Sequence, residues 1–295
     1  MKRLFSILTI VLAVIIVAIT PQQHVNASSN YLSTWLWDTN KMLSEPDRIL
    51  TFLESKEAEA VYLQIDRDIP SSSYRSFIKR AGERGIAVHA LDGASDWGER
   101  YSGKTPPPVI PWLKTYQNNA APSEKFTALH LDVEPYLHSS WNKNYAKSVL
   151  NYQTLIVNST KAANDMGLPL FVDMPFWFDE RTYSNKIGKG NLAEWIIKQA
   201  DGVNIMAYRD KAEGPNGIIA LVSNEMNWGN VYATPVTVGV ETMNLGSSES
   251  FTTFYEEGET YMQAELEKVR TAYSGYRSFN GFSMHHTYSW IDMKP

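Results

Sequence analysis

The sequence predicts an α/β protein built as a single (β/α)8 TIM barrel, and three observations predict it. Eight short apolar segments alternate with amphipathic ones, which is typical of a parallel sheet covered by helices. Several of the apolar segments are nearly continuous, as strands covered on both faces are. The chain has 295 residues, enough for one barrel of about 250 residues. The barrel can be irregular, because one misassigned segment would leave an open sheet.

The eight predicted strands are rich in β-branched, aromatic and leucine side chains. Their alternation with helical segments predicts that they pair in parallel. They cover residues 31–38, 60–65, 86–92, 128–134, 168–175, 202–208, 235–241 and 279–286.

Helix-start and helix-stop residues mark the segments between these strands. Ser44 is a candidate N-cap, with Pro46 in the first turn of the same helix, and Gly85 and Gly167 end two later helices. Residues 92–111 form a long irregular connection, and such loops are often functional. After the helix that Ser44 opens, the predicted helices cover 71–84, 111–120, 141–166, 191–200, 217–228 and part of 248–272.

Residues 1–27 have the pattern of a secretory signal peptide. Lys2 and Arg3 precede the uncharged apolar run 4–19, and small residues end the segment. We therefore expect a secreted or cell-surface protein whose barrel domain covers residues 28–295. The apolar run is slightly long, so an uncleaved membrane anchor is the alternative.

The composition argues against several partners and linkages. The chain has no Cys, so an exported form would have neither disulfides nor a lipid attached through cysteine. The formal net charge of −5 at pH 7 argues against nucleic acid and anionic membrane surfaces as partners. Contact with a membrane is expected only through an uncleaved N-terminal segment.

The predicted strand 128–134 places three polar side chains on one face. Side chains alternate along a strand, so His130, Asp132 and Glu134 point the same way, opposite to their apolar neighbours. Charged groups are rarely buried without partners and are common in functional sites. A structural ion pair for one of the two carboxylates is the alternative.

A polar residue ends nearly every predicted strand. Reactive groups in barrels of this kind gather at the carboxyl ends of the strands, so these residues predict a polar-lined cleft. Each Asp taken alone can also be a helix cap. The residues are Asp38, Asp66, Asp92, Glu134, Asp173, Tyr208, Glu241 and the pair His285-His286.

Glycoside hydrolysis is the first chemistry that these residues could perform. It needs a protonated acid beside the leaving oxygen and a second group at the other face of the sugar. Glu134 suits the acid, because the charge of Asp132 would raise its proton affinity. The second group is either Glu241, as a carboxylate nucleophile, or the substrate's own acetamido oxygen, oriented by Asp132.

Two other functions stay open. Metal-assisted hydrolysis could use His89, His130, Asp132, Glu134 and His286, although no HxH or HExxH spacing is present. A carbohydrate-binding or cell-wall-associated barrel could keep the cleft without turnover. We expect no metal and no cofactor.

Aromatic residues are abundant, with 9 Trp and 16 Tyr. Aromatic rings stack on sugars, although a single ring is more often part of a core. Candidate stacking platforms and further substrate-binding residues are Trp35, Trp37, Trp97, Trp177, Trp290, Asp173 and His286.

The segment 127–134 resembles the D-x-x-D-x-D-x-E signature of chitinase-like glycosidases. Asp132 and Glu134 match its last two acids, whereas Thr127 and His130 stand where its first two are expected.

A second segment is similar to the same family. Met206 and Tyr208 match its M-x-Y segment, and Arg209 stands where Asp usually follows. The resemblance implies a TIM-barrel glycosidase in which Glu134 is the general acid/base and Asp132 tunes and orients it. It also implies that Tyr208 helps to hold the acetamido group of the substrate.

Residues 133–135 also resemble the N-E-P motif of a large clan of retaining glycosidases, with Val133 where Asn is expected. That resemblance would make Glu241 the nucleophile. Both resemblances place the proton donor at Glu134. We therefore predict an exported glycoside hydrolase-like protein that acts on a polysaccharide or another glycan.

Overall fold

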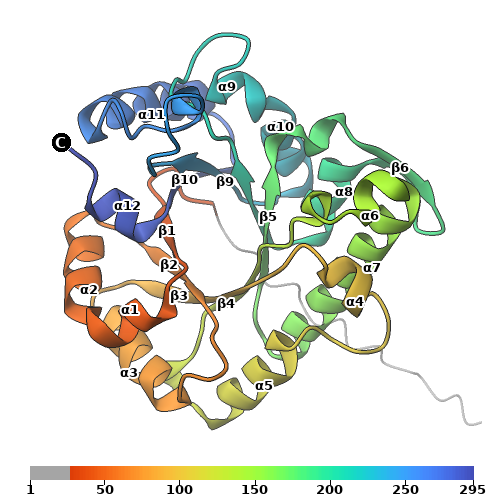
Figure 1. The fold of residues 1–295 in the computed structure, drawn as a ribbon, viewed down its shortest axis with the longest axis horizontal. Coiled ribbons are helices and arrows are strands. Elements are labelled where there is room, and N and C mark those ends of the chain that lie inside the picture. Colours follow the sequence, from red (N-terminus) through yellow and green to blue (C-terminus); the bar gives the residue numbers. More distant parts are fainter. Residues whose placement is uncertain (1–26) are drawn as a thin grey trace, which may run out of the picture.

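The computed structural model describes residues 27–295, so the predicted signal peptide or anchor lies outside the described residues, apart from Ala27. The barrel strands are β1 (Leu32–Leu36), β2 (Ala60–Gln64), β3 (Ala87–Asp92), β4 (Ala128–Leu131), β5 (Leu170–Pro175), β8 (Gly202–Met206), β9 (Val236–Glu241) and β10 (Phe279–His285). They close in the order β1-β10-β9-β8-β5-β4-β3-β2, and every neighbouring pair is parallel. This closed barrel, which helices surround (Figure 1), confirms the predicted fold class.

The helices form the outer layer of the molecule. They are α1 (Thr39–Ser44), α2 (Pro46–Ser55), α3 (Ser71–Gly82), α4 (Trp97–Tyr101), α5 (Val109–Asn119), α6 (Ser140–Lys143), α7 (Tyr145–Asp165), α8 (Leu192–Gln199), α9 (Ile218–Leu221), α10 (Ser223–Tyr232), α11 (Glu259–Tyr273) and α12 (Thr287–Ile291). Among residues 27–295, none of these helices is long and apolar enough to cross a membrane.

The two faces of β4 point into different layers, as the alternation predicts. Leu129 and Leu131 belong to the large core between the strands and the helices. His130 points to the barrel interior, where it packs against Tyr62 of β2, with ring centroids 4.1 Å apart. The interior therefore contains polar as well as apolar side chains, which is unusual unless they serve a site.

The start of the first predicted helix differs from the expectation. Ser44 does not cap α2; it is the last residue of α1, and its hydroxyl donates to Asn40 O at 3.2 Å. Asp38 caps α1 instead, because its carboxylate accepts from the Asn40 backbone N–H at 3.1 Å. The short helix α1 was not predicted, and it moves the start of α2 to Pro46.

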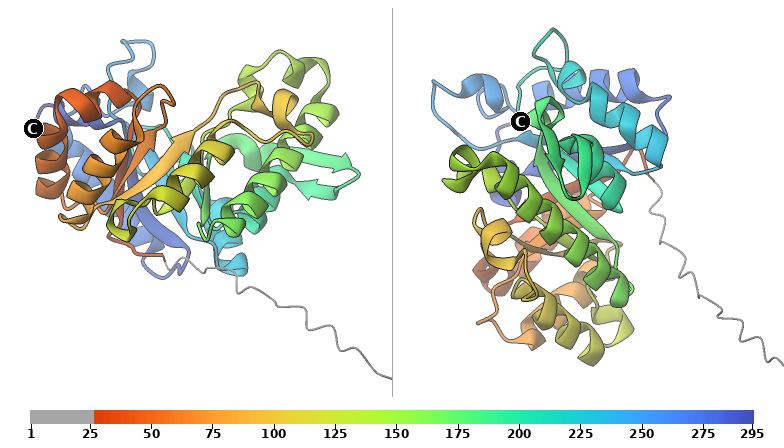
Figure 2. Two further views of the ribbon diagram at one scale, coloured as in Figure 1. Left: turned by 90° about the horizontal axis from the view of Figure 1, so that it is seen from below. Right: turned by 90° about the vertical axis from the view of Figure 1, so that its right-hand side faces the viewer.

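The longest predicted helix, 141–166, is divided into α6 and α7. Asn144 separates them and caps α7 by accepting a hydrogen bond from the Lys147 backbone N–H at 3.3 Å. An antiparallel hairpin of β6 (Thr182–Asn185) and β7 (Gly188–Asn191) follows β5 and was not predicted either. In the left view of Figure 2 this hairpin extends past the helices at the right-hand edge.

Two strands that carry predicted site residues are shorter than expected. β4 ends at Leu131 and the 3-10 helix η2 (Pro135–Leu137) begins at Pro135, so Asp132 and Glu134 lie just beyond the strand. The backbone N–H of Asp132 still donates to Asp92 O of β3 at 3.2 Å. β8 ends at Met206, so Tyr208 also lies just beyond its strand.

Candidate active site

Asp173 is a carboxylate of the barrel interior with three hydrogen-bond partners. Its Oδ2 accepts from Trp35 Nε1 at 2.9 Å, and its Oδ1 accepts from Asn204 Nδ2 at 2.8 Å and contacts His130 Nε2 at 2.8 Å. These partners come from β1, β8 and β4, so the bond to Trp35 crosses the barrel. The side chain is only 1% exposed, and both of its oxygens have hydrogen-bond partners.

Asp132 lies beside this carboxylate without a partner of its own. Its Oδ1 is buried and has no hydrogen bond among the described residues. Burial raises the pKa of Asp132 well above its usual range, and the charges of Asp173 and Glu134 raise it further. Asp132 therefore has a buried oxygen free to bond an incoming ligand.

Glu134 has a more open environment than Asp132. Its side chain is half-buried, and it forms no ion pair among residues 27–295. Its Oε1 accepts from the Tyr136 hydroxyl. The Tyr136 ring packs edge-on against Trp177, with centroids 4.9 Å apart. Glu134 is thus available to a ligand, and the Tyr136 ring lies between it and Trp177.

Glu241 is held differently from the other acids. Its Oε1 accepts from the backbone N–H groups of Thr242 and Met243, both at 2.8 Å, and its Oε2 lies 2.7 Å from His285 Nδ1. The residue is 3% exposed. Because three donors satisfy this carboxylate, it is a poor nucleophile in this arrangement.

His285 links Glu241 to a tryptophan at the barrel mouth. Trp37 Nε1 donates to His285 Nε2 at 3.0 Å. An indole N–H is only a donor, so His285 Nε2 must accept and His285 Nδ1 must carry the proton toward Glu241. This pair of bonds fixes one neutral tautomer of His285 and orients the Trp37 ring.

Tyr208 faces the same part of the barrel. Its ring centroid is 5.7 Å from that of His285. Burial raises the pKa of Tyr208 well above its usual range, and the charge of Glu241 adds to the effect. The phenol is therefore a hydrogen-bond donor at every pH at which the protein is expected to work.

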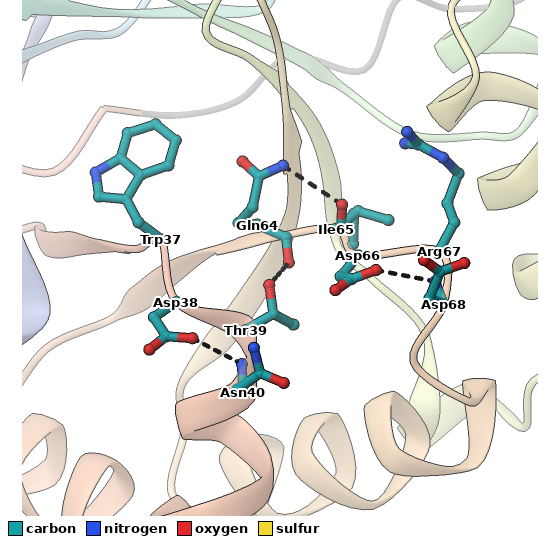
Figure 3. A pocket seen from close by; sticks show the side chains of 9 residues that line it. All are labelled: Trp37, Asp38, Thr39, Asn40, Gln64, Ile65, Asp66, Arg67 and Asp68. Carbon is teal, nitrogen blue, oxygen red and sulfur yellow. Dashed lines mark hydrogen bonds between the residues drawn. The ribbon is translucent and has the colours of Figure 1, made fainter.

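A polar hollow of about 420 Å³ opens at the ends of β1 and β2. Figure 3 shows Trp37, Gln64 and Arg67 along it, with Asp38 and Asn40 at the start of α1. Gln64 and Arg67 also bond the carboxylate of Asp92, at 3.2 and 2.6 Å. Burial nonetheless raises the pKa of Asp92, because it outweighs the attraction of Arg67.

The predicted tryptophan platforms separate into two groups. Trp97 is 5% exposed and packs on Tyr101, and Trp290 is 1% exposed and packs on Phe52. Both are part of the core between the elements, so the structure gives them no ring face for a sugar. Trp35 is also buried and holds Asp173. Trp37 and Trp177 stay partly exposed.

His286 is placed at a helix start rather than in the cleft. Its Nδ1 accepts from the Tyr288 backbone N–H at 3.3 Å and so caps α12. Burial lowers the pKa of His286 below its usual value. His89 lies deeper, with Nδ1 at 3.4 Å from His130 Nδ1, and burial lowers its pKa strongly.

The predicted metal ligands do not converge. In the part of the chain that the structure describes, no three His, Cys, Asp or Glu side chains gather in a way that could hold a metal ion. We therefore do not propose metal-assisted hydrolysis.

Several residues of the site were not identified from the sequence. Asn204 holds Asp173, and its Oδ1 is buried without a partner. The Tyr152 hydroxyl of α7 is also buried and has no hydrogen-bond partner among the described residues. Burial raises the pKa of Tyr152, and the charge of Asp132 raises it further. Asn204 stands inside a predicted strand at an inward position, which is a signal that could have identified it.

Comparison with known proteins supports the fold but not a close relationship. No family model and no curated protein matches this chain. A GH18 chitinase from Cycas revoluta, crystallised with (GlcNAc)4, is similar with a TM-score of 0.54 and 13% identity, over 89% of this chain and 96% of that one.

Two further solved structures are similar at the same level. A plant class V chitinase mutant from Cycas revoluta, in complex with (GlcNAc)3, has a TM-score of 0.55 and 13% identity over 89% of this chain and 96% of that one. The Bacillus cereus spore cortex-lytic enzyme SleL has a TM-score of 0.53 and 10% identity over 92% of this chain and 74% of that one. The protein is thus a TIM barrel whose fold resembles that of these chitinases.

Proposed function

We propose that this protein is a glycoside hydrolase that acts on a polysaccharide or another glycan, with Glu134 as the general acid/base. The observation that carries the proposal is the pair of acids beyond β4. One carboxyl oxygen of Asp132 is buried without a partner, and Glu134, two residues on, is half-buried and free of ion pairs among the described residues. Two carboxyl groups in unlike environments are the usual arrangement for acid/base chemistry on glycosidic bonds.

The surroundings of Glu241 favour one of the two mechanisms. A retaining nucleophile must approach the anomeric carbon, yet Glu241 is almost fully buried and bonded by three donors. The alternative is attack by an acetamido oxygen of the substrate itself. We therefore propose an N-acetylated sugar at the cleavage site, and Glu241 as the residue that fixes His285.

In this mechanism each residue has one task. Glu134 gives its proton to the leaving oxygen and later takes one from water. The free oxygen of Asp132 accepts from the N–H of the acetamido group, which turns the acetamido oxygen toward the reacting carbon. The Tyr208 hydroxyl donates to that oxygen and limits its motion. Asp173, bonded to Trp35 and Asn204, is a positioning residue.

The substitution Glu134→Gln tests the proposal. It keeps the shape of the side chain and removes the proton that is transferred, so turnover should fall at least about 100-fold. The measurement is a screen of labelled glycans, including N-acetylglucosamine oligomers, with wild type and variant. Glu83→Gln, on the exposed end of α3, is the matched control and should keep full activity. Unchanged turnover in a folded Glu134→Gln protein would refute the assignment.

A carbohydrate-binding barrel without turnover is the second candidate. It is favoured by the hydrogen bond from Tyr136, which occupies one oxygen of Glu134, and by Thr127 and His130 at positions where chitinase-like glycosidases have Asp. The same screen separates the two candidates. Glycan binding by wild type without any cleavage would favour the binding protein.

We also propose that the protein is exported to the cell surface or beyond. The support is the signal-like sequence of residues 1–27, together with a polymeric glycan as the proposed substrate. Fractionation of cells that express the full chain tests this proposal, and retention of the protein in the cytoplasm would contradict it.

A further inference from the structure

Arg209 lies at the barrel mouth directly after Tyr208. Its guanidinium lies over two aromatic rings, with Cζ 5.0 Å from the centroid of Phe176 and 5.5 Å from that of Phe251. Its Nη1 donates to Tyr208 O at 2.6 Å, and its Nη2 donates to Asn216 Oδ1 at 3.2 Å. These contacts hold the planar group in one orientation beside a proposed substrate-binding residue.

Most of the donors of this guanidinium are unused. An arginine has five N–H groups, and the two bonds above leave three without a protein partner among the described residues. Arg209 Nε is buried and unbonded, and Arg209 forms no ion pair within 4.0 Å in residues 27–295. Asp210 attracts it only from further away. A held guanidinium with free donors is suited to a carboxylate from outside the chain.

A second arginine has a similar position on the same aromatic turn. Arg181 Cζ is 5.0 Å from the centroid of Trp177, next to Phe176 in the 3-10 helix η3 (Phe176–Glu180). It is exposed and also has no ion pair among the described residues. Trp177 packs on Tyr136, which bonds Glu134. Two unpaired cations therefore flank the side of the site on which Glu134 lies.

The charges at the centre of the site explain why such cations would be useful. Asp173 and Glu241 are acids held by hydrogen bonds, and Glu134 adds a third carboxyl group. A neutral sugar needs no positive partner here. A glycan that carries carboxylates would be repelled by the acids unless cations were placed where its carboxylates lie.

From these observations we propose that Arg209 binds a carboxylate on the substrate, so that the preferred substrate is an acidic glycan. The inference rests on the proposed glycosidase function and specifies its substrate class. The carboxylate could belong to a lactyl ether on an amino sugar or to a uronic acid. Arg209 is thus a residue that determines specificity and takes no part in proton transfer.

Binding is measured by calorimetry in the Glu134→Gln background, so that no substrate is consumed. The probes are a neutral N-acetylglucosamine oligomer, an oligomer with lactyl-ether sugars and an oligomer with uronic acids. Arg209→Gln should weaken binding of one acidic oligomer by about tenfold, the value of one charged hydrogen bond. It should leave the neutral oligomer unchanged, and the acidic probe that responds identifies the source of the carboxylate.

Two more variants make the result specific. Arg209→Lys keeps the charge but loses the planar fork, so it should recover part of the affinity. Arg75→Gln is the matched control, because Arg75 also lies over a ring, Tyr116, at 6.0 Å and has an unbonded Nε, but belongs to the helical layer. This control should bind all three oligomers as the parent does.

The outcomes separate this inference from the function on which it rests. If Arg209→Gln weakened the binding of neutral and acidic oligomers equally, or weakened neither, the proposed carboxylate site would be overturned. A glycosidase that acts on neutral glycans would still be compatible with that result. Failure of the Glu134→Gln parent to bind any of the three oligomers, together with failure of wild type to cleave any of them, would overturn both. A loss of affinity confined to an acidic oligomer, and made smaller by added salt, would support the inference.

Discussion

The properties of Asp132 come from neighbours on other strands rather than from its own segment. Asp173 receives hydrogen bonds from Trp35 and Asn204, in addition to its contact with His130. Burial, together with the charge of Asp173, raises the pKa of Asp132. An asparagine at this position would copy the shape of the neutral carboxyl group but could never ionise, so it distinguishes geometry from charge.

We expect Asp132→Asn to lower kcat by about 100-fold, because an amide carries no negative charge to stabilise the positive charge that develops on the substrate as the acetamido oxygen attacks. Stability should not suffer. Burial raises the folded pKa of Asp132 above its unfolded value, so the wild-type protein loses stability as pH rises above about 4. The Asn variant has no such loss. The variant should therefore unfold at or above the wild-type temperature at pH 7. Steady-state kinetics and thermal unfolding measure the two effects.

The control for this prediction is Asp165→Asn at the exposed end of α7. It removes a carboxylate that pairs with Lys161 on the surface, and such pairs contribute little. The control should keep its activity and its melting temperature. Full activity of Asp132→Asn would show that Asp132 has no role in the reaction.

At the scale of the elements, the close approach of β3 and β4 places Asp132. A Cβ added to Gly93 would lie 1.8 Å from Asp132 O, closer than any side chain tolerates. The Asp132 backbone N–H donates to Asp92 O in the same region. Glycine is therefore required here for space, since its backbone conformation does not itself demand glycine.

Gly93→Ala should force the ends of these two strands apart. We expect a loss of about 1–3 kcal/mol in the free energy of unfolding, as for other overpacked positions. We also expect activity to fall by a larger fraction than the free energy of unfolding does. Gly103→Ala is the matched control, because its added Cβ meets nothing within 4 Å. Denaturant unfolding and the glycan assay measure both variants. Equal behaviour of the two would contradict the packing argument.

The elements and the strand-end acids follow from local sequence, whereas their partners do not. Residues two apart in a strand share a face, so Asp132 and Glu134 could be identified from the predicted strand 128–134 alone, although β4 itself ends at Leu131. Trp37 and His285 are 248 positions apart, and Trp35 and Asp173 are 138 apart. Their contacts depend on barrel closure and register, which the hydrophobic pattern of one sequence does not specify.

The same limit explains the errors at helix ends and among the tryptophans. Ser44 and Asp38 are both good caps, and only the fold decides that Asp38 starts a helix of its own. Trp290 and Trp37 are both aromatic residues near strand ends. Trp290 is buried against Phe52, whereas Trp37 donates a hydrogen bond to His285 at the barrel mouth.

For the molecule as a whole, buried ionisable groups set opposing limits on stability. The chain has no cysteine, so its core must stabilise the barrel without disulfides. The lowered pKa of His89, caused by burial, means that stability is lost as pH falls below about 6.5, where the unfolded chain takes up a proton. Glu225 acts in the other direction. It is 0% exposed on α10, neither carboxyl oxygen has a partner among the described residues, and burial raises its pKa strongly.

Glu225→Gln should therefore stabilise the protein in a pH-dependent way. Wild type must keep Glu225 protonated when folded, so its stability falls as pH rises above about 4.5, by up to about 1.4 kcal/mol per pH unit until the folded pKa is reached. The amide has no such term, so the gain should grow between pH 4 and pH 7. Urea unfolding at several pH values measures it, with exposed Glu249→Gln as the control. A stability difference that is the same at every pH would mean that Glu225 is ionised in the fold, with a partner that only a bound ion or water could supply.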